Sequence, residues 1–451
     1  MSQFSSFSIR GLTIHADAYA LCVFIVRLLS MTQFRRFFAH TRQEAAGARI
    51  QRINFSRKKE CFIIWLIPPE RMNTVKIQPF AVEEWMNAYE TRCRYNIAET
   101  CVDSISLDQL FELAGQDRDA FFRKISSVRL TYGDIEGYPP FLEGIARLYR
   151  NIQPSEVVVT HGAAGANHHL FYSLIEPGDH VVTVVPTYQQ LTSIPASFGA
   201  RVDTLRLRSE NHYLPDPAEL RALVTPETRL ICINNPNNPT GSLMPPALLN
   251  EIVQIARDND CYLLCDEVYR LLTQEPGELS PSIADLYEKG ISVSSMSKVF
   301  SLAGLRLGWV ATRDSGLRAA CLSHRDYNHI SCGLFDERVA AIALGASAKL
   351  LERSRGIIRE NLQILDDFIH RQPHLQYVRP SAGTTALVRY DLAMDSRQFC
   401  TTLCERYGAL VTPGDCFDEP RTFRIGYACR KEELEQGLAA LERMLRDCSQ
   451  A

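Results

Sequence analysis

The feature that most constrains the fold is an alternation of strand-like and helix-like segments between residues 157 and 312. Short apolar runs rich in β-branched residues occur at 157–160, 181–185, 200–207, 229–234, 262–265, 291–294 and 308–312. Strands that alternate with helices predict a mainly parallel sheet covered on both faces. We therefore expect an α/β fold whose large domain holds a mainly parallel seven-stranded sheet between helices. Ligands of such sheets bind beyond the carboxyl ends of the strands.

The two flanks of this region predict a smaller α/β domain built from both chain ends. Helical patterns precede the alternation, and one of them begins at the capping residue Ser106 and ends at Gly115. Two long helices, three short strands and a closing amphipathic helix at 431–447 follow it. The expected parts are an N-terminal arm with part of the small domain at 72–118, a large domain at 119–325 and a C-terminal small domain at 326–451.

Residues 1–71 differ from the rest because basic residues outnumber acidic ones. The segment could be an Arg-rich mitochondrial transit peptide, a secretory signal without a clear cleavage site, or an upstream extension with Met72 as the working start. We favour the extension and expect it to be poorly ordered. The expected location is the cytoplasm, or the mitochondrion if the segment is a transit peptide.

Composition excludes several classes of protein. A net charge of -3 gives no reason to expect nucleic acid as a partner. No apolar run reaches the roughly 18 residues of a membrane span, so no membrane contact is expected. The 14 cysteines form no CxxC pair. They favour free thiols in a reducing compartment over disulfides or a metal site.

Two charged residues, Lys298 and Asp266, lie in mainly apolar stretches, where an unpaired charge is energetically unfavourable. Lys298 stands alone among serines and apolar residues, so its amine could lose a proton near neutral pH and form a Schiff base with an aldehyde cofactor. It could equally be a lysine at a strand end that reaches solvent. Asp266 ends an apolar strand, where a carboxylate needs a partner; a protonated ring nitrogen would serve, and a helix N-cap is the structural alternative.

In order along the chain, the segments Asn-Asn-Pro-Asn-Asn-Pro-Thr-Gly (234–241), Cys-Asp-Glu-Val-Tyr (265–269) and Ser-Ser-Met-Ser-Lys (294–298) resemble those of pyridoxal-phosphate-dependent class I and II aminotransferases, with the aspartate aminotransferase fold. The resemblance covers about residues 76–450. It implies a homodimer that uses pyridoxal 5'-phosphate and acts on small-molecule substrates, amino acids and 2-oxo acids. It also implies that Lys298 is the Schiff-base lysine and the acid/base, and that Asp266 pairs with the pyridine nitrogen. Asn238 and Tyr269 would contact the cofactor's phenolic oxygen.

The same resemblance assigns further positions. The phosphate ligands would be Gly162, Ala163, Ala164, Ser295 and Arg306, together with Tyr132 from the neighbouring subunit. A helix N-terminus and an arginine fork both suit phosphate. The ring of Tyr188 would stack on the pyridine, although a core tyrosine is the alternative. On the substrate side, Arg424 would bind the α-carboxylate, with Asn238 and Ala98 nearby.

Two segments depart from the family pattern and leave the substrate open. Asn-Ile-Ala-Glu-Thr-Cys (96–101) replaces a glycine-rich stretch, and Ala-Gly-Thr-Thr (382–385) replaces a Gly-Gly-aromatic run. Both line the substrate side in the family. Glu99 could bind a basic or hydroxylated side chain, or it could be a structural carboxylate.

The function expected is transamination between an L-amino acid and a 2-oxo acid. The alternative is a pyridoxal-phosphate-dependent lyase or cyclase, similar to the aminocyclopropane-carboxylate or capreomycidine synthases. A non-catalytic effector-binding domain of a transcription regulator is disfavoured, because residues 1–71 contain no helix-turn-helix pattern.

Overall fold

The computed structural model describes residues 22–27, 48–55, 59–66, 77–275 and 280–449. The chain divides into two compact units, Met1–Lys76 and Ile77–Ala451. In the first unit, strands β1 (Cys22–Arg27), β2 (Ala48–Phe55) and β3 (Lys59–Leu66) form an antiparallel sheet in the order β1-β3-β2. Their β-branched and aromatic residues are typical of strands. The expectation that residues 1–71 are poorly ordered stays a prediction. Met72 lies outside the described residues.

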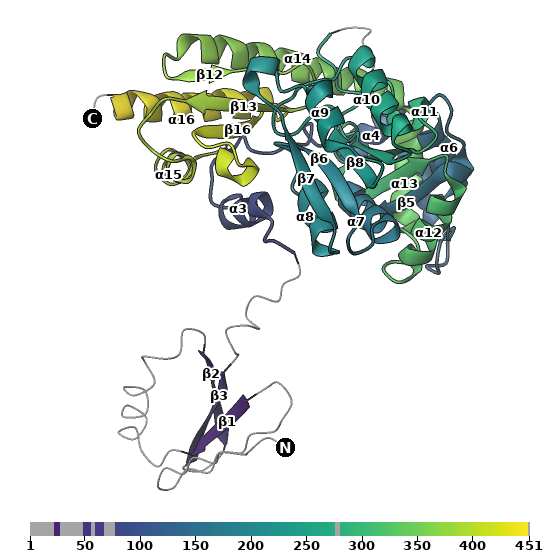
Figure 1. Cartoon of the computed structure of the whole chain (residues 1–451), viewed down its shortest axis with the longest axis horizontal. Helices are drawn as coiled ribbons and strands as arrows, with labels where there is room; N and C mark the ends of the chain where they lie inside the picture. The colour runs from purple at the N-terminus through teal and green to yellow at the C-terminus, as the bar shows by residue number, and fades with distance from the viewer. Residues whose placement is uncertain (1–21, 28–47, 56–58, 67–76, 276–279, 450–451) are drawn as a thin grey trace. The chain divides into compact units, whose positions relative to one another are not determined.

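The second unit is built on a seven-stranded sheet (Figure 1). Its strands are β5 (Val157–His161), β6 (His180–Val185), β7 (Arg201–Arg206), β8 (Thr228–Asn234), β9 (Tyr262–Asp266), β10 (Gly290–Ser295) and β11 (Leu307–Thr312). They lie in the order β5-β11-β10-β9-β8-β6-β7. Strand β11 runs antiparallel to both of its neighbours, β5 and β10, whereas the other neighbouring strands are parallel. The predicted α/β fold with a mainly parallel sheet is confirmed.

Helices cover both faces of this sheet. On one face lie α7 (Gly162–Leu174), α8 (Gln190–Ser197) and α12 (Ser315–Asp326), and on the other lie α9 (Pro217–Leu223), α10 (Pro246–Asp258) and α11 (Ile283–Leu286). Side chains of the strands pack against both helical layers because successive side chains point to opposite faces of the sheet. In β6, for example, Val181 packs into the first layer, whereas Val182 and Val184 pack into the second.

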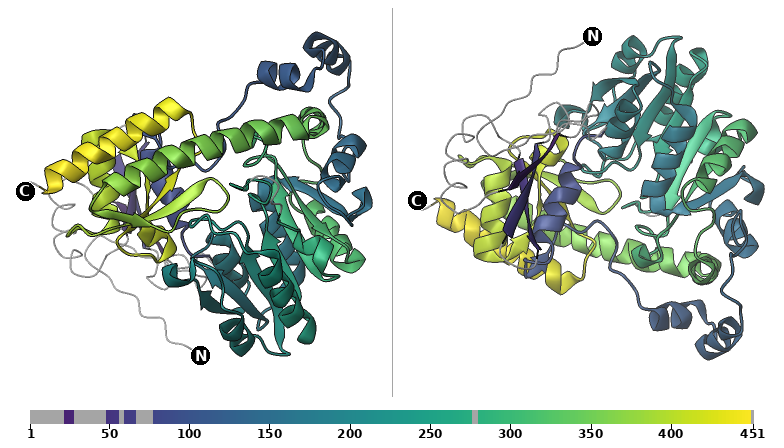
Figure 2. Two further views of the ribbon diagram at one scale, coloured as in Figure 1. Left: turned by 90° about the horizontal axis from the view of Figure 1, so that it is seen from above. Right: turned by 90° about the horizontal axis from the view of Figure 1, so that it is seen from below.

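A smaller sheet follows the large one in sequence. It contains β12 (Leu375–Tyr377), β13 (Thr385–Tyr390), β16 (Thr422–Gly426) and β15 (Thr412–Pro413), in the order β12-β13-β16-β15. The long helices α14 (Ser347–Arg371) and α16 (Lys431–Ser449) pack side by side in this region (Figure 2). Near the start of the unit, β4 (Tyr95–Asn96) pairs with β14 (Ala409–Leu410), so residues from both ends of the unit meet.

The remaining helices complete the unit. They are α3 (Ala81–Tyr89), α4 (Leu107–Ala114), α5 (Arg118–Ser126), α6 (Pro139–Ala146), α13 (Leu334–Gly345) and α15 (Ser396–Thr402). Helix α4 has the predicted ends: Ser106 forms a capping box with Gln109, and Gly115 closes the helix at φ +65°. Helix α5 was not anticipated from the sequence.

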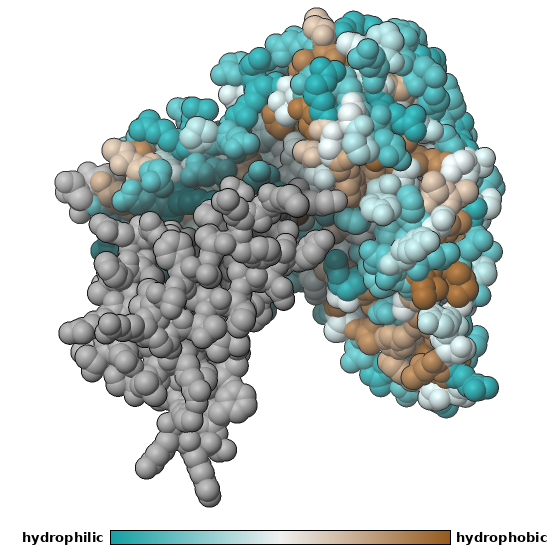
Figure 3. Space-filling model, turned by 60° about the horizontal axis from the view of Figure 1, so that its bottom comes forward, coloured by the Kyte–Doolittle hydropathy of each residue, from teal (hydrophilic) through white to brown (hydrophobic). Residues whose placement is uncertain are grey.

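The described surface and thiols agree with the composition. No helix in the described ranges is long and apolar enough to cross a membrane. The coloured residues on the face drawn in Figure 3 are mainly hydrophilic, with apolar residues in separate groups. The 12 cysteines whose side chains the structure describes are all free thiols, as predicted.

Candidate active site

The strand ends bring the predicted residues to one edge of the large sheet. Asn234 at the end of β8 is in register with Asp266 at the end of β9, and Ser295 at the end of β10 is in register with Gly308. A cavity of about 310 Å³ opens there. It is lined by the predicted residues Ala98, Ala163, Ala164, Tyr188, Asn238, Asp266, Tyr269, Ser295, Lys298, Arg306 and Arg424.

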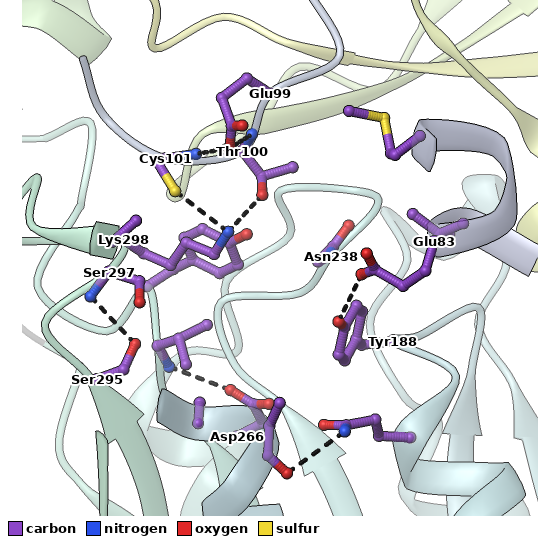
Figure 4. Close-up of a pocket in the computed structure, with 18 of the residues that line it drawn as sticks. Glu83, Glu99, Thr100, Cys101, Tyr188, Asn238, Asp266, Ser295, Ser297 and Lys298 are labelled. Carbon is purple, nitrogen blue, oxygen red and sulfur yellow. Dashed lines mark hydrogen bonds between the residues drawn. The ribbon is translucent and has the colours of Figure 1, made fainter. Parts of the chain in front are cut away.

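Lys298 points into this cavity from the loop after β10 (Figure 4). Its Nζ donates to Thr100 Oγ1 at 2.6 Å and to Cys101 Sγ at 3.5 Å. Burial acts to lower the pKa of Lys298, but the ionisable groups around it, among them Cys101, Tyr269 and Glu99, raise the pKa above its usual value. The sequence-based expectation of a lowered pKa was therefore wrong for the ligand-free protein. The amine is surrounded by groups that favour its charged form.

Asp266 lies on the floor of the cavity and is 3% exposed. Its Oδ1 accepts from Val268 N, and its Oδ2 accepts from Asn167 Nδ2, both at 3.2 Å. Burial raises the pKa of Asp266 to about 6. Within the described ranges no Lys, Arg or His side chain forms an ion pair with it. Such a carboxylate is suited to a cationic partner in the cavity, such as a protonated ring nitrogen.

An anion cradle lies where α7 begins directly after β5. The first-turn N–H groups of Ala163 and Ala164 have no acceptor within the helix. Gly162 has φ +69°, and a Cβ there would lie 2.8 Å from Arg306 Nη2. The arginine therefore approaches the helix start closely. Ser295, whose Oγ accepts from Ser297 N at 3.3 Å, lines the same space, so these groups fit a phosphate.

Arg424 occupies the other side of the cavity and is 3% exposed. Its guanidinium donates to Asn238 Oδ1 at 3.1 Å, Ala98 O at 3.2 Å and Thr412 Oγ1 at 3.1 Å. Its Nε has no hydrogen-bond partner. Burial lowers the pKa of Arg424. Because all three acceptors are uncharged, this buried cation is suited to bind a carboxylate.

Two tyrosines frame the space between these groups. Tyr188 donates from its hydroxyl to Glu83 Oε1 at 3.0 Å (Figure 4). Its ring centroid lies 4.9 Å from that of Phe80. Tyr269 is 1% exposed and lines the cavity beside Lys298. Both rings could contact a planar cofactor.

The structure also shows which predicted positions lie elsewhere. Gly162 shapes the cradle but does not line the cavity, and neither does the 382–385 segment. Tyr132 is 67% exposed and lies outside the cavity. Its contact with a neighbouring subunit stays a prediction.

Some lining residues that fix the predicted groups were not singled out from the sequence. Asn167 fixes Asp266, and Glu83 accepts a hydrogen bond from Tyr188. Thr100 and Cys101 lie in the 96–101 segment expected on the substrate side, but their bonds to the amine of Lys298 were not foreseen. A signal existed only for Asn167, a polar residue on the apolar face of α7 that is 1% exposed. The others come from segments far from their partners in sequence.

A second group of ligand-type side chains lies outside the cavity. We expected no metal site, yet possible ligand atoms of His161, His329 and Cys332 lie within 4.8 Å of one another. The rings of His161 and His329 stack at 4.3 Å. Burial lowers the pKa of His329 to about 4. This group joins the start of α7 to the chain after α12.

Comparison with known proteins places the chain in a family. The model of aminotransferase class I and II matches residues 111–441. The chain is 32% identical over 290 residues to a capreomycidine synthase of Streptomyces vinaceus, covering 64% of this chain and 74% of the relative. It is 28% identical over 319 residues to the arginine–pyruvate transaminase AruH of Pseudomonas aeruginosa. This match covers 68% of this chain and 80% of the relative.

A solved structure agrees with these relatives. A PLP-dependent aminotransferase from Streptococcus suis superposes with a TM-score of 0.80 at 43% identity, covering 83% of this chain and 99% of the other. The chain belongs to the class I and II aminotransferase family. Membership implies pyridoxal phosphate as the cofactor, and the carboxylate, amine and anion cradle of the cavity fit its ring nitrogen, aldehyde and phosphate.

Proposed function

We propose that the protein is an aminotransferase that moves an amino group between an L-amino acid and a 2-oxo acid. One observation carries the proposal: a lysine amine, a buried carboxylate and a buried arginine with an unpaired Nε meet in one cavity. Pyridoxal phosphate supplies an aldehyde that takes up the amino group and a ring that withdraws electrons from the substrate α-carbon. The chain supplies binding, orientation and proton transfer.

The cofactor is held from three sides in this proposal. Asp266 pairs with the ring nitrogen, while Asn238 and Tyr269 contact the phenolic oxygen. Tyr188 stacks on the ring. The phosphate is bound by Ala163, Ala164, Ser295 and Arg306, with Gly162 allowing the close approach and Tyr132 reaching from a second subunit of a homodimer.

Arg424 orients the substrate. A bidentate pair with the α-carboxylate fixes the plane of the amino acid, and Asn238 and Ala98 hold the guanidinium in place. Lys298 Nζ then moves a proton to and from the α-carbon. Thr100 Oγ1, 2.6 Å from Nζ, keeps the amine near this path.

The relatives support the proposal without deciding the reaction. One is named as a transaminase acting on arginine and pyruvate, and another as a synthase. A lyase or cyclase reaction would use the same cavity, so the products have to be identified.

The test is product analysis with ¹⁵N-labelled amino acids and a 2-oxo acid such as pyruvate or 2-oxoglutarate. We expect the label in a new amino acid, with one 2-oxo acid formed for each one consumed. Labelled ammonia, or a cyclic product that keeps the label, would reject transamination in favour of the lyase or cyclase reaction.

A further inference from the structure

Three carboxylates in the cavity have no role in the chemistry above. Glu83 lies in α3, Glu90 directly follows the end of this helix, and Glu99 lies on the segment that carries Thr100 and Cys101. The remaining charged residues of the cavity lining are Asp266, Lys298, Arg306 and Arg424. Each of those has a partner in the cofactor or in the substrate's α-carboxylate. The surplus charge of the lining is therefore negative.

Backbone hydrogen bonds fix Glu99 in place. Its Oε1 accepts from Thr100 N at 2.7 Å and from Cys101 N at 2.9 Å. Burial acts to raise the pKa of Glu99, but the charge of Lys298 and these N–H groups lower it below its usual value. Glu99 is therefore ionised at neutral pH, and both of these backbone hydrogen bonds use the same oxygen, Oε1.

Glu83 and Glu90 lie nearer to solvent, where α3 borders the cavity (Figure 4 shows Glu83). Glu83 Oε1 accepts from Tyr188, and Glu90 Oε1 accepts from Asn96 Nδ2 at 3.4 Å. Burial raises the pKa of Glu90, and the charges of Glu99 and Glu83 add to the shift. The three carboxylates thus repel one another across one space. In the described part of the chain none of them forms an ion pair with Lys or Arg.

Arg424 gives an independent sign that this space binds a ligand. It is 3% exposed, lines the same cavity, and leaves Nε without a partner. The cavity therefore offers one buried cation for a carboxylate and a separate group of carboxylates for a cation. A ligand that matches both has a carboxylate at one end and a positive charge at the other.

We propose that the amino donor carries a cationic side chain, a guanidinium or an ammonium, which Glu99 binds directly. Glu83 and Glu90 extend the negative region toward the opening of the cavity and attract the cation. The proposal rests on the proposed transamination and names the substrate class of that site.

The test uses the full-length, cofactor-loaded protein and pairs of donors that differ in side-chain charge. L-Arginine is compared with L-citrulline, and L-lysine with L-norleucine, with L-glutamate as the acidic donor. Dissociation constants come from the shift of the cofactor's absorbance band, and kcat/KM comes from 2-oxo acid formation. A charge-assisted hydrogen bond predicts that the cationic member of each pair binds about 10- to 100-fold more tightly.

Glu99→Gln separates this role from a structural one. Glutamine keeps an oxygen for Thr100 N and Cys101 N but removes the charge, so the arginine-to-citrulline preference should fall about 10-fold or more while citrulline binding stays unchanged. Glu84→Gln is the control for removing a carboxylate charge near the cavity, since Glu84 lies next to Glu83 on α3 but outside the cavity lining. It should leave the preference as it is.

The outcomes separate the two proposals. Turnover of neutral or acidic donors in preference to cationic ones overturns the cation site and leaves transamination standing. An equal loss for arginine and citrulline in Glu99→Gln also overturns it, because that is the mark of a structural carboxylate. If no amino acid transfers its nitrogen, the proposed function itself fails.

Discussion

Asp266 is a carboxylate whose environment is complete only when a cation enters the cavity. Its burial raises its pKa to about 6, so the ligand-free fold is destabilised once this group ionises. Below about pH 3.8, the pKa of this group in the unfolded chain, the carboxyl is protonated in both states and its contribution to stability is fully present. This contribution is lost as the pH rises through about 6, the pKa of the group in the folded protein. Above pH 6 the carboxylate needs a positive partner.

Asp266→Asn should therefore have opposite effects on the two forms of the protein. At pH 7.5 the ligand-free variant should be more stable than wild type, by up to about 3 kcal/mol. Its affinity for pyridoxal phosphate should fall at least about tenfold. Thermal unfolding with and without cofactor, from pH 4 to 8, measures both.

The difference between the ligand-free proteins should disappear near pH 4, where wild-type Asp266 is protonated. A variant that is less stable than wild type at pH 7.5, or that binds the cofactor equally well, would show that Asp266 is a structural residue.

The individual residues differ in how far the sequence could predict them. Asp266 was predictable because the cost of its burial follows from the apolar strand before it. The pKa direction of Lys298 was not, because its neighbours in sequence are serines and apolar residues. The groups that hold its amine lie 198 and 197 residues away. Only the tertiary fold brings them together.

At the scale of elements, the contact between β11 and the start of α7 sets the anion cradle. A Cβ on Gly308 would lie 2.3 Å from the carbonyl carbon of Gly162 and 2.5 Å from Ala163 N. Neither atom can move without moving the helix start. This close approach holds the first-turn N–H groups beside Arg306.

Gly308→Ala should therefore push the start of α7 away from β11. We expect a loss of about 1–3 kcal/mol in stability, as for other overpacked sites, and a larger loss of cofactor affinity. Gly304→Ala is the control, because a Cβ there meets nothing within 4 Å. Equilibrium dialysis of pyridoxal phosphate gives the affinities. Equal affinity in the two variants would contradict the assignment of the cradle.

The elements that sequence could predict were those with strong local patterns. The seven strands, the capped helix α4 and the closing helix α16 follow from periodicity and capping residues. Helix α5 was missed because none of its residues is buried, so no apolar stripe marks it. The short β4–β14 pair was missed because its two strands are more than 300 residues apart in the chain.

At the scale of the whole molecule, the candidate site belongs to one unit. All residues that line the cavity fall between Val82 and Arg424, within the unit Ile77–Ala451. This unit also contains the three buried apolar clusters of the described residues. The sequence predicted a separate N-terminal segment from its charge, but its strands were not predicted.

Removal of residues 1–76 should leave a folded protein that binds pyridoxal phosphate with an affinity within about twofold of the full chain. The unfolding temperature and cofactor titration of the two proteins can be compared directly. A truncated protein that aggregates or does not bind the cofactor would show that the unit Ile77–Ala451 depends on the N-terminal unit.

The central claim is that Lys298 carries the cofactor in this cavity, and chemical reduction tests it most directly. Borohydride fixes the bond between pyridoxal phosphate and the lysine that holds it, and trypsin no longer cuts after that lysine. Mass spectrometry should then find the cofactor's mass on the peptide 290–306, with cleavage missing after Lys298. Attachment of the cofactor to a different lysine would contradict the account. Normal cleavage after an unmodified Lys298, in protein that showed the cofactor's absorbance band before reduction, would also contradict it.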